Sequence, residues 1–329
     1  MSFGRVLARP LFLVPRRRSP CSPKLGPVST ATASVVRPDP RADIPGYLAR
    51  LGLERPARPD VDSLFAIHEA HMTRVPYENL EIQLDRPTTV DPVESIARIV
   101  RGRGGYCFHL NGALGTLLAS LGYDVTRHLG QVRGTGVDQD APELTVNHQV
   151  LTVRCEGESW LVDCGLGDAP LAPMALRAGE HPQGLFTYRL APWAAREGGW
   201  RFVHDPAARS FPSMVFAPEP VEPEAFAAAH QHLSTSPDSS FVQAAVVARC
   251  DRRRAVEVLR SRVFTRIDAA GRSQQVLDTP DEWYALLADV FGLDLPDVDA
   301  EARERLWRRV SASHEQWLSK QKTEEPAGA

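Results

Sequence analysis

The chain carries apolar residues at helical spacing over residues 44–121. Leu64 and Ile67 lie on one face of a predicted helix in this part of the chain. Asp91 followed by Pro92 is a start signal, since these residues favour the cap and the first position of a helix. The pattern therefore predicts several helices before residue 121.

After residue 122 the pattern changes to short runs in which apolar and polar residues alternate. β-Branched residues are frequent in these runs, and Gly, Pro and Asp separate them. Strands are predicted at residues 124–132, 146–153, 160–163, 186–190, 200–204 and 213–216. Their length and spacing favour a small antiparallel barrel or sandwich.

The last third of the chain mixes both patterns. A connecting helix is predicted at residues 223–230, and a hydroxyl-rich loop at 234–241. Strands of a second sheet follow at 241–250, 255–259, 263–267 and 273–277, and helices at 279–291 and 299–318. Taken together, the elements predict an α+β protein.

The two ends of the chain differ from the rest. Residues 1–40 carry seven basic residues before their first acid, Asp39, with frequent Pro, Ser and Thr. An apolar patch precedes the arginine cluster, which is the wrong order for a secretory signal. A transit peptide and a misassigned start codon both fit, but the composition favours a disordered extension. Residues from Lys320 onward are also predicted to be disordered.

Composition narrows the functional class. The apolar and charged fractions, 43% and 24%, are typical of a globular protein. A net charge of −3 gives no electrostatic signature for nucleic acid, and no apolar run reaches the roughly 20 residues of a membrane helix. Five cysteines without a CxxC pair argue against a disulfide framework and a structural zinc site. We therefore expect a cytoplasmic protein without a metal.

Cys107 is the strongest candidate for a reactive residue. It follows Gly104, Gly105 and an aromatic residue, and a helix-competent apolar run begins just after it. At a helix N-terminus, the unpaired backbone N–H groups and the helix macrodipole stabilise the thiolate form of a cysteine. The thiolate is the attacking species in nucleophilic catalysis. A lone cysteine is more often a small buried residue, so this assignment depends on partners.

His148 and Asp163 are the best candidates for those partners. His148 lies in a predicted strand, and Asp163 ends the next strand before a glycine-containing loop. Neighbouring strands can bring the two side chains together, so that Asp163 orients the imidazole and stabilises its charged form. Taken alone, a histidine in a strand is more often a hydrogen-bonded structural residue, and an aspartate before a glycine is more often a turn residue. His68 and His71 are expected to be solvated or capping residues, and His109 is expected to face outward.

Several motifs occur in an order that resembles the arylamine N-acetyltransferase family. They are Val75–Leu80 (VPYENL), Arg103–Phe108 (RGGYCF), Asn147–His148, Leu161–Gly167 (LVDCGLG) and Thr235–Phe241 (TSPDSSF). The resemblance extends from about Ile44 to at least Ile267. It implies an N-terminal helical bundle, a central antiparallel β-barrel and a C-terminal α/β lid around a Cys-His-Asp core like that of cysteine proteases and transglutaminases. The expected domains are 41–121 with the nucleophile, 122–230 with the His and Asp, and 231–329, after the disordered extension 1–40.

By the same resemblance, Cys107 is the acetyl-accepting nucleophile, His148 the base and Asp163 its orienting group. The implied reaction is a ping-pong transfer of acetyl from acetyl-CoA, as a substrate and not a bound cofactor, to an aromatic amine, hydrazine or N-hydroxyarylamine. Arg103 and Glu78 match a buried pair that supports the site. The matching positions for substrate and CoA are Gly165, Leu166, Gly167, Thr235 and Ser236.

Two positions depart from the family pattern. Position 109 is His where the family often has Glu, and Leu166 replaces a more usual Phe beside the acceptor. These differences leave the acceptor open, and the oligomeric state is also open. Three alternatives remain: an amide synthase of the same family that releases a polyketide as a lactam, a non-catalytic binding protein, and a Cys/His metal site. For the last, Cys107 and His109 have no further ligand at recognisable spacing.

Overall fold

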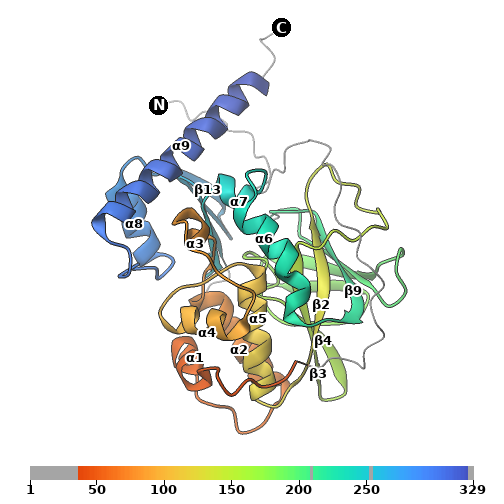
Figure 1. Cartoon of the computed structure of the whole chain (residues 1–329). Helices are drawn as coiled ribbons and strands as arrows, with labels where there is room; N and C mark the ends of the chain where they lie inside the picture. The colour runs from red at the N-terminus through yellow and green to blue at the C-terminus, as the bar shows by residue number, and fades with distance from the viewer. Residues whose placement is uncertain (1–35, 208–209, 252–254, 325–329) are drawn as a thin grey trace.

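The computed structural model describes residues 36–207, 210–251 and 255–324 of the 329-residue chain. Within these ranges the first part is helical, as predicted, and most of its helices lie together on one side of the molecule (Figure 1). They are α1 (Ile44–Leu51), α2 (Val61–Arg74), α3 (Leu80–Gln83), α4 (Pro92–Val100) and α5 (Cys107–Ser120).

Helix α5 lies at the centre of the fold. All of its residues from Cys107 to Ala119 are buried, since it packs against α1 and α4 on one side and strands β2 and β3 on the other. A mostly apolar helix without a solvent-facing polar side requires such a position. Gly115 allows the close approach, because a Cβ there would lie 3.3 Å from a methyl group of Leu151. The first residue of α5 is therefore held by packing around the whole helix.

Local capping fixes where the neighbouring helices begin. The Asp91 carboxylate accepts a hydrogen bond from Val93 N at 2.9 Å, and Pro92 occupies the first turn of α4, as the sequence predicted. Helix α2 begins with a reciprocal capping box between Asp60 and Ser63. Both caps satisfy backbone N–H groups that have no partner within their helix.

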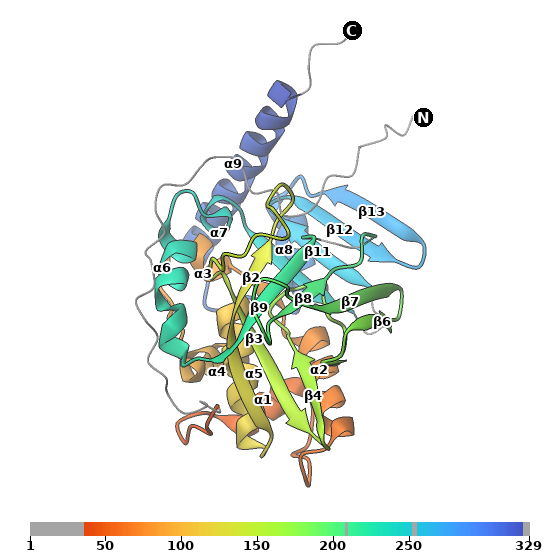
Figure 2. The ribbon, with the colours of Figure 1, turned by 90° about the vertical axis from the view of Figure 1, so that its right-hand side faces the viewer.

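The central sheet is antiparallel, barrel-like and eight-stranded, in the order β5-β4-β3-β2-β9-β8-β7-β6. Its strands are β2 (Asp124–Arg133), β3 (His148–Cys155), β4 (Glu158–Val162), β5 (Met174–Ala175), β6 (Gly179–Gln183), β7 (Phe186–Pro192), β8 (Trp200–Val203) and β9 (Ser213–Pro220). In Figure 2, β2, β3 and β4 lie in front of α5. The strands predicted between residues 124 and 216 are confirmed, with small shifts of their ends.

A second, five-stranded sheet has the order β1-β10-β11-β12-β13. Its strands are β1 (Tyr77–Glu78), β10 (Val246–Cys250), β11 (Val256–Arg260), β12 (Val263–Asp268) and β13 (Gly271–Val276). Strand β1 comes from the helical part of the chain, which the sequence did not indicate. The division into three domains at residues 121 and 230 stays a prediction.

The strand predicted from Phe241 begins only at Val246. Residues 240–243 form a short helix, α7 (Ser240–Gln243), because the Ser239 hydroxyl accepts a hydrogen bond from Phe241 N at 3.2 Å and caps it. Before it lie the 3-10 helix η1 (Pro223–Phe226) and α6 (Ala227–Thr235). These elements link the barrel-like sheet to the second sheet.

Two helices, α8 (Pro280–Asp289) and α9 (Ala300–Glu324), cover the second sheet with their own apolar core around Trp283, Leu287 and Leu306. The far end of α9 extends away from the body in both views (Figures 1 and 2). The disorder expected from Lys320 is therefore wrong for residues 320–324, and 325–329 lie outside the described residues.

At the other end, the predicted disordered extension lies outside the described residues up to position 35. Val36 is buried, and its N donates a hydrogen bond to Val125 O at 2.8 Å. Val36, which falls within the predicted extension, is therefore packed against β2.

Candidate active site

Cys107 is the first residue of α5, directly after the extended N-cap residue Tyr106. Its side chain is buried, and Sγ lies 3.6 Å from Asn147 O. The helix macrodipole and the free N–H groups of the first turn stabilise negative charge at this position. The sequence-based expectation that the cysteine begins a helix is confirmed.

His148 and Asp163 meet because β3 and β4 are adjacent antiparallel strands. His148 is the first residue of β3, and Asp163 follows the last residue of β4. Nε2 of His148 lies 2.7 Å from Oδ2 of Asp163, and both side chains are almost fully buried. With Nε2 bound to the carboxylate, Nδ1 is the ring nitrogen that remains for the sulfur of Cys107.

His148 carries the positive charge of this site. Burial alone lowers the pKa of His148, but the charge and hydrogen bond of Asp163, together with a hydrogen bond to Cys107, outweigh it and raise the pKa to about 10. The imidazolium form is therefore favoured at neutral pH. The structure thus brings all three residues expected at the centre of the site into one buried group.

Asn111, one turn after Cys107 on α5, is a site residue that the sequence reasoning missed. Its Nδ2 donates to Asp163 Oδ1 at 2.7 Å and to Gln149 O at 2.6 Å. Its Oδ1 accepts from Cys164 N at 2.9 Å. An amide in an otherwise apolar helical run, four residues after the cysteine, was the available signal. Asn111 ties the helix of the nucleophile to the carboxylate and to the loop that follows it.

The loop after Asp163 packs directly against the nucleophile. A Cβ at Gly165 would lie 2.7 Å from Cys107 Cα, so only glycine fits there. The Gly165 N–H donates a hydrogen bond to Asp163 Oδ1 at 2.8 Å. Leu166 is buried, and Gly167 has a φ of 83°, which favours glycine. The place of Gly165 beside the substrate stays a prediction.

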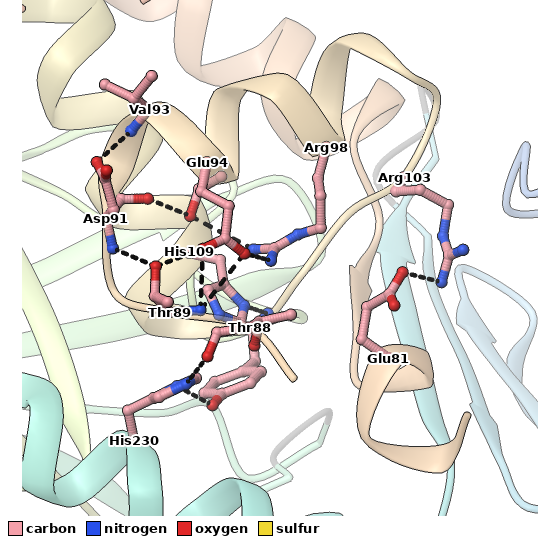
Figure 3. Close-up of polar contacts among 12 residues, drawn as sticks. Glu81, Thr88, Thr89, Asp91, Val93, Glu94, Arg98, Arg103, His109 and His230 are labelled. Carbon is pink, nitrogen blue, oxygen red and sulfur yellow. Dashed lines mark hydrogen bonds and ion pairs between the residues drawn. The ribbon is translucent and has the colours of Figure 1, made fainter. Parts of the chain in front are cut away.

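Arg103 and Glu78 are both buried, with Arg103 Nε 3.8 Å from Glu78 Oε1. Shorter contacts join Arg103 to Glu81 at 2.8 Å (Figure 3) and to Asp297 at 3.3 Å. Burial opposes the charge of Arg103, but Glu78, Glu81 and Asp297 outweigh it and raise the pKa of the guanidinium. Asp297 connects the cysteine loop to the segment between α8 and α9, and no sequence pattern indicated it.

The Glu78 carboxylate also organises the backbone before the nucleophile. Its oxygens accept hydrogen bonds from Leu80 N at 2.6 Å and from Gly104 N at 3.2 Å. A Cβ at Gly104 would lie 1.9 Å from Pro76 O, which explains the glycine. Glu78 therefore fixes the turn that leads to Cys107 in addition to facing Arg103.

The expectations for three histidines are wrong. His68, His71 and His109 are all buried, not solvated or outward-facing. Burial lowers the pKa of His68 to about 4 and of His71 to about 3, so both rings are neutral. His68 Nε2 lies 3.3 Å from the backbone carbonyl oxygen of Asp163. Burial also lowers the pKa of His109, which packs on Tyr106 with ring centroids 4.4 Å apart.

Thr235 and Ser236 lie at the C-terminal end of α6, in a segment that is largely exposed. The Thr235 hydroxyl donates to Gln231 O at 2.7 Å, and the Ser236 hydroxyl accepts from Asp238 N at 3.3 Å. In the described ranges, no three His, Cys, Asp or Glu side chains gather as a metal ion would require. None of the described helices is long and apolar enough to span a membrane.

Comparison with known proteins assigns the family. An N-acetyltransferase family model matches residues 60–300. An arylamine N-acetyltransferase of Mycolicibacterium smegmatis is 35% identical over 286 residues, which cover 79% of this chain and 96% of that protein. This chain belongs to the arylamine N-acetyltransferase family. The members of this family are acyltransferases, and the chain is an enzyme of that class.

Solved structures of arylamine N-acetyltransferases share the fold. The Mycobacterium marinum enzyme in complex with CoA aligns with a TM-score of 0.73 at 28% identity, over 82% of this chain and 99% of that one. Another relative is the Proansamycin X synthase of Amycolatopsis mediterranei. It is 32% identical over 153 residues, which are 45% of this chain and 58% of that protein.

Proposed function

We propose that this arylamine N-acetyltransferase transfers an acetyl group from acetyl-CoA to an aromatic amine, hydrazine or N-hydroxyarylamine through a thioester on Cys107. The observation that carries the proposal is the buried group at the N-terminus of α5. There the cysteine meets a histidine whose other ring nitrogen is 2.7 Å from Asp163. A nucleophile, a base and an orienting carboxylate are the parts that acyl transfer through a covalent intermediate requires.

In the first half-reaction, the Cys107 thiolate attacks the thioester carbonyl carbon of acetyl-CoA. The C–S bond to CoA then breaks, and the imidazolium of His148 gives its proton to the departing CoA thiolate. In the second half-reaction, the amine attacks the acetyl-cysteine carbonyl, and the now neutral His148 takes a proton from the amine nitrogen. Release of the Cys107 thiolate restores the ion pair. Asp163 stabilises the imidazolium in both directions.

For the donor, we assign the hydroxyls of Thr235, which is exposed, and Ser236, which is half-buried, to the phosphates of CoA. Their position at the end of α6, at the start of the largely exposed turn that leads to α7, supports this role. The related M. marinum structure contains CoA, which supports a CoA thioester as the donor. For the acceptor, we assign Leu166 and Gly167 to the wall beside the nucleophile. An aliphatic side chain at position 166 favours contact without aromatic stacking.

A second candidate function is amide synthesis with a carrier-bound acyl donor. The similarity to a Proansamycin X synthase is the observation in its favour. Both candidates use the same three residues, but in amide synthesis the donor is carrier-bound and the accepting amine belongs to the acyl chain itself. The share of that protein covered by the match, 58%, is smaller than the 96% of the M. smegmatis arylamine N-acetyltransferase. The acetyl-CoA-dependent function is therefore favoured.

Initial-rate kinetics test the proposal. With acetyl-CoA and an aromatic amine varied together, a covalent acetyl-enzyme predicts parallel lines in double-reciprocal plots. Cys107→Ala should abolish turnover, whereas Cys250→Ala, at another buried cysteine, should retain it. Intersecting lines, or turnover by purified Cys107→Ala, would contradict the mechanism. No turnover with acetyl-CoA, but turnover with an acylated carrier protein, would favour the second candidate.

A further inference from the structure

Tyr106, the residue before Cys107, makes a contact that the proposed chemistry does not use. Its hydroxyl lies 2.5 Å from Nδ1 of His230 on α6. Nε2 of the same ring lies 2.6 Å from Thr88 O (Figure 3). Because a carbonyl oxygen can only accept, Nε2 carries the proton and Nδ1 accepts the hydrogen bond of the Tyr106 hydroxyl. Burial lowers the pKa of His230, which keeps the ring in this neutral form.

This contact is one of the anchors of the segment that contains α6 and α7. Tyr106 and His230 are both buried, and the anchor at His230 precedes the exposed residues 231–232. The second anchor is Phe241, whose ring centroid lies 5.1 Å from that of Tyr106. The carbonyl of Phe241 accepts hydrogen bonds from Asn79 at 2.9 Å and from Gln83 at 2.6 Å. The segment is therefore attached to the helical part of the chain at both ends.

Between the anchors lie Thr235 and Ser236, the residues assigned above to the donor. Both hydroxyl groups form hydrogen bonds within the segment itself: the Thr235 hydroxyl donates to Gln231 O, and the Ser236 hydroxyl accepts from Asp238 N. The position and orientation of these hydroxyls relative to the sulfur therefore depend on what holds the segment, which includes these two anchors. Tyr106 precedes Cys107 by one residue, so its hydrogen bond links the donor segment to the backbone directly next to the nucleophile.

We propose that Tyr106 and His230 are positioning residues, whose hydrogen bond holds the donor-binding segment in place and so determines the efficiency of acetyl transfer from acetyl-CoA. The inference rests on the proposed function and adds two residues that touch neither the reacting carbonyl nor the amine. It predicts that breaking this one bond impairs the donor half-reaction and leaves the acceptor half-reaction intact.

Tyr106→Phe is the variant that tests it, because it removes one oxygen and keeps the ring. The matched control is Tyr47→Phe, since Tyr47 is also buried and its hydroxyl has no hydrogen-bond partner among the described residues. His230→Asn retains an acceptor near the position of Nδ1, whereas His230→Leu retains none. We expect His230→Asn to recover part of the activity that His230→Leu loses.

In a ping-pong reaction, kcat/KM for each substrate reports its own half-reaction. Tyr106→Phe should lower kcat/KM for acetyl-CoA about tenfold, the effect of one lost buried hydrogen bond. It should leave kcat/KM for the aromatic amine unchanged, and Tyr47→Phe should leave both values unchanged. Acetylation of Cys107 by p-nitrophenyl acetate, which contains no CoA, should proceed at the wild-type rate in Tyr106→Phe.

Two results would overturn the inference. One is an unchanged kcat/KM for acetyl-CoA in Tyr106→Phe. The other is an equal loss with p-nitrophenyl acetate, which would mean that Tyr106 acts on the nucleophile and not on the donor segment. Failure of the proposed function is distinguishable, because wild-type protein would then form no acetyl-enzyme with acetyl-CoA at all.

Discussion

The contact between Asn111 and Asp163 predicts a pH-dependent loss of stability in Asn111→Asp. The variant has nearly the same shape, but it replaces the amide that lies 2.7 Å from Asp163 Oδ1 with a second carboxyl group. Two carboxylates at this distance in a buried site cannot both be ionised. The new carboxyl group therefore keeps its proton in the folded protein to a higher pH than in the unfolded chain.

The magnitude follows from linkage. At low pH the protonated carboxyl group introduced by Asn111→Asp can still donate to Asp163, so mainly the bond to Gln149 O is lost, which costs about 1 kcal/mol. A carboxyl group whose folded pKa is raised binds its proton more tightly in the folded state. Stability therefore falls as pH rises above the unfolded pKa of about 3.9, by about 1.4 kcal/mol per pH unit, until the folded pKa is reached. Near pH 7 the total loss is about 5 kcal/mol.

Urea unfolding of wild type, Asn111→Asp and Asn111→Ala at pH 5 and pH 8 measures this effect. Asn111→Ala removes the same donor without adding a charge, so its loss should vary little between the two pH values. The difference between the variants isolates the repulsion of the two carboxylates. An equal loss of stability in Asn111→Asp at pH 5 and pH 8 would refute the account of this contact.

Three further predictions concern buried titratable side chains. The pKa of His148 in the folded protein is raised to about 10, so its pairing with Asp163 contributes stability that is fully present below pH 6.5 and is lost as the pH rises through about 10. His148→Gln should therefore flatten this part of the profile of unfolding free energy against pH, measured with urea. Arg103→Met should cost about 3–5 kcal/mol because it removes the guanidinium that neutralises the largely buried carboxylates of Glu78 and Glu81. Arg309→Met, at an exposed ion pair, should cost less than about 1 kcal/mol in the same assay, and equal losses would contradict the assignment. His71 is held neutral with a pKa of about 3, so its burial contributes stability that is present above pH 6.5 and is lost as the pH falls toward 3. Because phenylalanine does not take up a proton, His71→Phe should unfold less readily in acid when unfolding is followed by circular dichroism.

The sequence was informative wherever local chemistry determines structure. Asp91 and Pro92 mark the start of α4, and the glycines before Cys107 mark the start of α5. The alternation of residues along β3 and β4 predicted neighbouring strands that carry His148 and Asp163. In each case the signal lies within a few residues of the feature that it predicts.

The failures have a common physical cause, which is burial imposed by distant parts of the chain. Because α5 is buried on all sides, its pattern does not indicate which face meets a partner, so Asn111 was missed and His109 was expected outside. His68 and His71 occupy polar positions of α2 that the segment after β4 and helix α1 cover. Strand β1 has two residues and is defined by its pairing with β10 and by a bridge to Gly105, both distant in the sequence.

The central claim is that Cys107 accepts the acetyl group, and intact-protein mass spectrometry tests it most directly. Brief exposure to acetyl-CoA should add one acetyl group to wild type, on the peptide that contains Cys107, and none to Cys107→Ala. An aromatic amine added afterwards should remove this mass as the acetylated amine forms. A wild-type protein that shows no adduct while its thiol still reacts with iodoacetamide, or an adduct that the amine does not discharge, would contradict the account.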